Sequence, residues 1–261
     1  MKRLLCFVVV ILLMSSVSYG AEGQMGIYIA PKISYGLTQM RGVDHVGTMG
    51  DSVDHYIIGN DTDHTIGGAF AIGYDFNKQF NVPIRTELEY SIYSKAKAEK
   101  QYATGAFIPG EILKDNQTYR IQTLLLNAYW DINTDTKFTP YLGVSLGMAF
   151  VKTGFGRSHH NILNPSDPVF NDPNVEWEEP DTYKDWGKKT VTNFAWGLSA
   201  GVGYDITDNW TIDLGYRFLN LGKVKTGISS LTNDDGVLNT GYTKTNHLYQ
   251  HQFTLGVRYT F

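Results

Sequence analysis

Residues 194–206 read Phe-Ala-Trp-Gly-Leu-Ser-Ala-Gly-Val-Gly-Tyr-Asp-Ile. From Phe194 onward, every second position carries an apolar side chain, whereas the positions between them carry alanine, glycine, serine or aspartate. A repeat of two residues is typical of a β-strand, because successive side chains of a strand point to opposite faces. This stretch therefore predicts a strand with one apolar face and one face of small or polar residues.

The same alternation recurs in seven other places along the chain. They are residues 26–37, 66–76, 84–92, 124–132, 140–150, 210–218 and 252–261. Eight short strands with this pattern favour an all-β fold, an eight-stranded antiparallel β-barrel that crosses a membrane. An open sheet is disfavoured, because its unpaired backbone edges would face hydrocarbon.

The chemistry of the two strand faces separates a membrane barrel from a soluble one. In a soluble barrel the inward face is apolar and the outward face is charged. Here the apolar face is large and continuous, and the other face mixes glycine and alanine with charges, which suits a narrow polar lumen. Aromatic residues gather at strand ends on the apolar face, at one level Phe76, Trp130, Tyr204, Trp210, Tyr259 and Phe261, and at the other Tyr35, Phe150, Phe194 and Phe218. We expect these to be the two aromatic girdles at the membrane interfaces.

The connections between the expected strands alternate in length. Short connections cover residues 77–83, 133–137 and 207–209, and long polar segments follow the first, third, fifth and seventh strands. Long extracellular loops and short periplasmic turns are typical of outer-membrane barrels. An even number of strands then places both termini in the periplasm.

The first twenty residues have the pattern of a secretory signal peptide. Lys2 and Arg3 precede an apolar run that ends at Met14, and small and polar residues lead to Gly20. We expect cleavage after Gly20, with residues 21–261 forming the barrel. An uncleaved anchor is the less favoured alternative, because the apolar run is short for a bilayer. The single cysteine, Cys6, lies in this segment, so neither disulfides nor thiolate metal sites are expected in the barrel.

The formal net charge of the whole chain is −4. Loss of Lys2 and Arg3 with the signal peptide makes it more negative. A nucleic-acid partner is disfavoured, because such proteins usually carry a basic surface.

Five patches and the C-terminus resemble the opacity proteins and the OmpA/OmpX-type domains, a superfamily of small outer-membrane barrels. The patches are residues 67–76, 85–90, 139–143, 194–205 and 213–217. At the C-terminus, the alternating apolar residues resemble the signal that such barrels present to the barrel-assembly machinery; they are Phe253, Leu255, Val257, Tyr259 and Phe261. The resemblance implies a surface antigen, an adhesin or a narrow porin-like protein, with function residing in the loops.

Seven charged residues lie on the predicted inward face: Lys32, Arg85, Glu87, Glu89, Asp213, Arg217 and Arg258. The favoured interpretation is a structural network of paired charges that fixes strand register, because side chains fill the interior of an eight-stranded barrel. An ion path through the lumen is the alternative. Glu87 and Glu89 share a strand face, as paired catalytic carboxylates can, but we expect Arg85 and Arg217 to act as their counter-ions.

Two long connections contain candidate binding residues. The first has three Asp-His pairs, and His45, His55 and His64 are of the type that binds zinc when a carboxylate orients the imidazole. The favoured alternative is an ordinary solvated loop. In the third, Trp177, Tyr183 and Trp186 are candidate anchors for a partner, or they pack the loop onto the barrel rim.

No histidine and nucleophile are brought together by spacing, so we expect no enzymatic activity and no cofactor. The sequence favours a surface protein surrounded by outer-membrane lipid, whose extracellular loops serve adhesion, partner binding or antigenic roles toward a host or cell-surface ligand. The alternative is a narrow porin-like passage for ions or small solutes.

Overall fold

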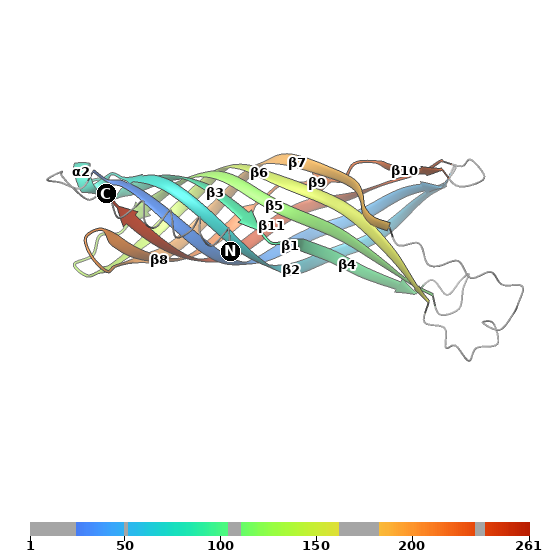
Figure 1. Cartoon of the computed structure of the whole chain (residues 1–261), viewed down its shortest axis with the longest axis horizontal. Coiled ribbons are helices and arrows are strands. Elements are labelled where there is room, and N and C mark those ends of the chain that lie inside the picture. Colours follow the sequence, from blue (N-terminus) through green and yellow to red (C-terminus); the bar gives the residue numbers. More distant parts are fainter. Residues whose placement is uncertain (1–24, 50–51, 104–110, 162–182, 233–237) are drawn as a thin grey trace, which may run out of the picture.

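The computed structural model describes residues 25–49, 52–103, 111–161, 183–232 and 238–261 (Figure 1). The expected signal peptide, residues 1–20, lies outside these ranges. The strands are β1 (Ile27–Met49), β2 (Ser52–Asp75), β3 (Ile84–Tyr93), β4 (Ala96–Ala103), β5 (Glu111–Asp131), β6 (Phe138–Asn161), β7 (Tyr183–Asp205), β8 (Trp210–Asn220), β9 (Val224–Lys225), β10 (Ser229–Thr232) and β11 (Leu238–Thr260). A short helix, α2 (Asn77–Phe80), follows β2. Within the described ranges, no helix is long and apolar enough to span a membrane.

Eight strands form a closed ring of antiparallel ladders. Their order is β1-β2-β3-β5-β6-β7-β8-β11, and β11 pairs back onto β1 from Tyr28 opposite Thr260 to Met49 opposite Asn239. The other three strands extend the ring at one end, where β4 pairs with β5, and β9 and β10 pair with β11. The predicted all-β, eight-stranded antiparallel barrel is confirmed. Closure matters because unpaired backbone groups in hydrocarbon cost several kcal/mol each.

The strand faces point as the alternation predicts. On β3, Leu88 is 55% exposed, while its neighbours Glu87 and Glu89 are 3% and 0% exposed. The same contrast holds around the ring, with apolar residues such as Ile33 and Leu214 on the outside. The outer wall is therefore the apolar surface, and the charges lie inside.

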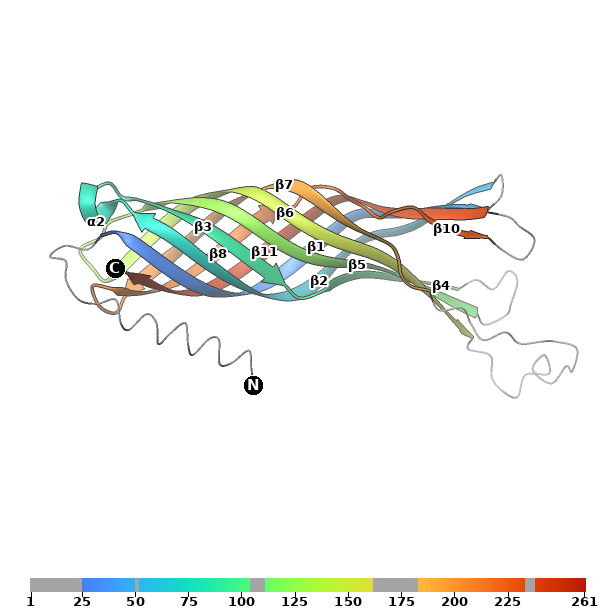
Figure 2. The ribbon, with the colours of Figure 1, turned by 45° about the horizontal axis from the view of Figure 1, so that its top comes forward.

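The two ends of the barrel differ in construction. At one end, which we call the turn end, short connections join the strands, and the C-terminus lies beside α2 (Figure 1). The turn after α2 uses Asn81 in the left-handed region, with a φ of 52°. At the other end, the arm end, the strands separate into two groups in both views (Figures 1 and 2). The first arm consists of the ends of β1, β2, β10 and β11, and the second arm of β4 and the ends of β5 and β6.

The arms correct the expectation of long loops. β1 and β2 run as a paired ladder to Met49 and Ser52, so most of the segment read as the first loop is strand. The sequence signal stops earlier because both strand faces are polar there, as in Thr62-Asp63-His64. The ladder of backbone hydrogen bonds continues without an apolar face, whereas a period-two pattern is visible only where one face is apolar.

Candidate functional site

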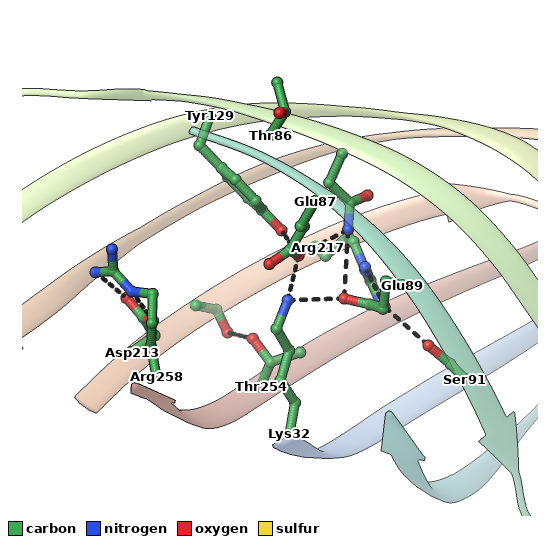
Figure 3. A network of polar contacts seen from close by, with 12 residues as sticks. Lys32, Thr86, Glu87, Glu89, Ser91, Tyr129, Asp213, Arg217, Thr254 and Arg258 are labelled. Atoms are coloured by element: carbon green, nitrogen blue, oxygen red, sulfur yellow. Dashed lines mark hydrogen bonds and ion pairs between the residues drawn. The ribbon is translucent and has the colours of Figure 1, made fainter. Parts of the chain in front are cut away.

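The interior near the turn end contains a network of charges that crosses the lumen (Figure 3). Lys32 on β1 donates from Nζ to Oε1 of Glu87 and, at 2.8 Å, to Oε2 of Glu89, both on β3. Arg217 on β8 approaches the other oxygen of Glu89, with 2.8 Å between Nη1 and Oε1. Glu89 is fully buried between these two cations. The network therefore joins strands that are not neighbours in the ring.

Glu87 is saturated by donors on adjacent strands. Its Oε1 accepts from the Tyr129 hydroxyl at 2.8 Å and from Nδ2 of Asn127 at 2.9 Å. Its Oε2 accepts from the Tyr28 hydroxyl at 3.2 Å. A carboxylate held by an ammonium and three further donors has no position left for a substrate proton. This arrangement supports the structural interpretation of Glu87 over acid/base chemistry.

Arg85 and Arg258 form a second group of ion pairs closer to the turn end. Nε of Arg85 lies 2.6 Å from Oδ2 of Asp131, and Nε of Arg258 lies 3.1 Å from Oδ2 of Asp213. Asp75 lies 4.0 Å from Arg258. The expectation that Arg85 would neutralise Glu87 or Glu89 was wrong, because Lys32 and Arg217 take that place. Asp75 and Asp131 went unnamed in the sequence reading, although each ends an inward-facing alternation.

Aromatic rings complete this half of the interior. The guanidinium of Arg85 lies 4.8 Å from the ring centroid of Tyr129 and 5.1 Å from that of Tyr141. The ring of Tyr28 lies so close to Gly73 that a Cβ there would come within 2.3 Å of it. Glycine on the inner wall thus makes room for the large rings.

The space left among these side chains is about 30 Å³ and is bounded mainly by the charged residues and by Tyr129 and Tyr141. Such a cavity has room for no more than a few water molecules. The turn-end half of the lumen is consequently filled.

The half of the interior nearer the arm end is apolar, which the sequence did not predict. Its largest buried side chains include Met40, Leu125, Leu219, Leu221 and Leu248. Leu125 lies in the run Leu124-Leu125-Leu126, where apolar residues on both faces hide the alternation. The barrel therefore holds two stacked plugs, one of paired charges and one of packed hydrocarbon.

The three candidate zinc-binding histidines are not brought together. His45 is buried inside the barrel, stacked on Phe155 at 4.2 Å between ring centroids. His64 is exposed on the outer wall, with Nδ1 2.5 Å from the Tyr35 hydroxyl. His55 lies nine residues before His64 on the same strand, about 30 Å away at the rise of a strand. Among the described residues, no group of three or more His, Cys, Asp or Glu could hold a metal ion.

The remaining candidates differ in how far the structure reaches them. Trp177 lies outside the described residues. The backbone of Tyr183 pairs with Arg157, and that of Trp186 with Phe155, so both positions belong to β7 rather than to a loop. On β11 the five residues of the expected assembly signal face outward in alternation with inward residues such as Arg258.

A closed antiparallel ring with an apolar outer wall and a filled polar interior is the structure of a small outer-membrane β-barrel protein. The family model described as "Outer membrane protein beta-barrel domain" matches residues 7–261, and the chain belongs to this family.

Individual relatives agree with this assignment. The chain is 31% identical to outer membrane protein PagN of Salmonella typhimurium over 243 residues, which cover 92% of each protein. It is 30% identical to opacity protein opA60 of Neisseria gonorrhoeae over 57% of this chain and 56% of that protein. The crystal structure of Neisserial surface protein A aligns with 92% of this chain and all of that one, at a TM-score of 0.48 and 17% identity. The expected resemblance to the opacity proteins is confirmed, and PagN and the opacity proteins are non-enzymatic outer-membrane proteins.

Proposed function

We propose that this protein is a non-enzymatic surface protein whose two arms project from the cell and bind a ligand on a host or neighbouring cell. The turn end faces the periplasm in this proposal, together with both ends of the mature chain. Support comes from the short connections at the turn end, which are typical of the periplasmic side. The backbone N–H of Met25, the first described residue, donates to the carbonyl of Phe261, so the two ends of the described chain lie together there.

The observation that carries the proposal is the length of the strands at the arm end. β1 passes the expected girdle residue Tyr35 and continues for 14 residues to Met49, which is about 45 Å along the strand. Paired strands hold their side chains in fixed positions, so an arm offers a binding surface that is ordered before the ligand arrives. Such preorganisation lowers the entropic cost of association.

The filled interior argues against the alternative, a porin-like passage. Ion pairs fill one half of the lumen, and apolar side chains fill the other. A permeating ion would have to displace both, so the arms remain the better candidates for function.

The test is to shorten each arm without opening the barrel. Met40 and Asp61 are partners across β1 and β2, so residues 41–60 can be replaced by an Asn-Gly turn, which joins two strands in register. In the second arm, Ala98 and Gln117 are partners, and residues 99–116 are replaced in the same way. Bacteria displaying each variant are then compared for binding to cultured epithelial cells.

We expect at least one shortened variant to lose cell binding while its barrel still migrates faster on gels when unheated, the behaviour of an intact small barrel. Binding by both shortened variants at the level of the full protein would contradict the proposal. Protease accessibility of the arms on intact cells tests the orientation separately.

A further inference from the structure

Three cations surround a small hollow on the outside of the barrel, where β5, β6 and β7 leave the apolar wall. Arg120, Lys152 and Lys188 border a cavity of about 80 Å³, together with Thr118, Thr153 and Gly154. All three cationic side chains are exposed. None of the described residues that line this hollow is acidic.

The backbone forms this hollow by a local irregularity. The pairing of β6 with β7 shifts register between Thr153 and Phe155, as in a β-bulge. Gly187, with a φ of 56°, adopts the left-handed conformation just before Lys188. Beneath, the Thr118 hydroxyl donates to the Gly154 carbonyl at 3.1 Å and fixes the neighbouring strands. Bulges of this kind redirect side chains and are common beside functional sites.

The placement of the charges is costly unless an anion joins them. Arg120 and Lys152 are directly opposite each other in the β5–β6 ladder. Like charges at opposed positions destabilise a sheet. A bound anion would remove this repulsion, and a guanidinium beside ammonium groups suits a phosphate, because arginine donates two parallel hydrogen bonds to its oxygens.

The level of the hollow points to a lipid as the source of that phosphate. On β6, the outward positions run from Phe138 to Phe150, and Lys152 is the next outward position. The twelve residues from Phe138 to Phe150 span about 40 Å along a strand, or about 30 Å across the membrane at the usual tilt. Lys152 therefore lies just beyond the hydrocarbon, at the level of the head groups.

We propose that Arg120, Lys152 and Lys188 form a binding site for the phosphate of an outer-leaflet glycolipid whose acyl chains lie along the apolar wall below. This site is separate from the ligand surface of the arms. It rests on the proposed orientation, since the opposite orientation would place it in the inner leaflet. Its role is to anchor the barrel to phosphorylated lipid at the base of the second arm.

The experiment uses the refolded full barrel in a zwitterionic detergent, with diphosphoryl lipid A as the probe. Binding is followed by the rise in the thermal unfolding midpoint during titration. The site variant carries Arg120→Gln, Lys152→Gln and Lys188→Gln. The control variant carries Lys78→Gln, Lys137→Gln and Lys223→Gln, three exposed lysines elsewhere on the protein that change the net charge equally.

We expect the site variant to bind lipid A about tenfold more weakly than the wild type and the control. Added salt should reduce the difference, because exposed charges are screened. A variant with Lys152→Arg alone should keep binding, since the cation is retained.

Three results would overturn the proposal. The first is equal affinity of the site and control variants for lipid A. The second is equal protection by inorganic phosphate at the same concentration, which would indicate a site for a small free anion. The third is loss of heparin binding in the site variant with unchanged lipid A binding, which would indicate a sulfated polymer. Cell binding through the arms is measured on the same variants, so failure of one proposal is distinguishable from failure of the other.

Discussion

At the scale of single residues, the interior is governed by pairing rather than by the sign of any one charge. Glu89 is fully buried and lies between Lys32 and Arg217, and Ser91 donates to it as well. A buried ion pair adds little over a well-packed apolar pair, but removal of one partner leaves a charge that is expensive to bury. These residues therefore have their largest effect when they are changed singly.

The first prediction concerns Arg217→Met. This change leaves Glu89 with one cation, and we expect a loss of about 3 kcal/mol in the free energy of unfolding. Urea unfolding of the lipid-reconstituted barrel measures it. Adding Glu89→Gln should recover part of the loss, because the unpaired charge disappears. A single variant as stable as the wild type would rule out the pairing described here.

The second prediction compares two glycines on one strand. In Gly73→Ala the new methyl would lie 2.3 Å from the Tyr28 ring and 2.5 Å from the Thr86 carbonyl, so overpacking should cost about 1–3 kcal/mol. Gly68→Ala is the control, because no atom lies within 4 Å of its added methyl. Equal unfolding midpoints for the two variants would contradict the close contact at Gly73.

At the scale of elements, side chains close a gap that backbone pairing leaves open. β4 pairs with β5 but not with β2, although it lies near β2. Two carboxylates bridge the gap, where Asp63 accepts from the N–H of Lys97 and Asp61 from that of Glu99, each at 2.9 Å. One member of an Asp-His pair thus stabilises the wall of the barrel.

The third prediction follows from this seam. Asp61→Ala with Asp63→Ala should raise the amide exchange of Lys97 and Glu99 about tenfold, because each N–H loses its acceptor. Asp135→Ala, in a connection at the turn end, is the control. Exchange in the middle of β3 should not change. If the two amides exchange as slowly as before, the carboxylates do not close the seam.

The fourth prediction concerns pH in the second arm. The Lys114 ammonium donates to Glu99 and lowers the pKa of that carboxyl from its ordinary value. A lowered pKa means that the pair stabilises the arm above the ordinary value and that this contribution is lost as the pH falls through the folded pKa. An NMR titration of the Glu99 carboxyl carbon should show a low midpoint that rises in Lys114→Gln. Identical midpoints would contradict the pair.

The sequence predicted the elements well only where lipid imposes a pattern. Between Ile84 and Ile92 each outward residue is apolar, so the strand and its inward glutamates were both readable. In the arms, water on the outer face removes that constraint, and residues 62–64 gave no sign of a strand. The partner of Arg85 was missed for another reason: Asp131 is distant in sequence, and the strand register that brings them together is not visible in the chain.

At the scale of the whole molecule, the two plugs predict electrical silence. In planar bilayers we expect no conductance steps from the wild type, because neither the charged nor the apolar half leaves a continuous aqueous path. Arg217→Met should be silent as well, since the apolar residues around Leu219 and Leu248 remain. Regular steps in the wild type would restore the porin-like alternative.

The pairing of β1 with β11 has a consequence for the order of events during biogenesis. The first strand synthesised finds one of its two partners only when the last residues of the chain arrive, and contacts so distant in sequence form slowly. Until then β1 has an unsatisfied edge that can pair with other chains. The protein must therefore be chaperoned for as long as its C-terminus is missing, and a chain cut short before β11 would be a substrate for degradation or aggregation rather than a smaller barrel.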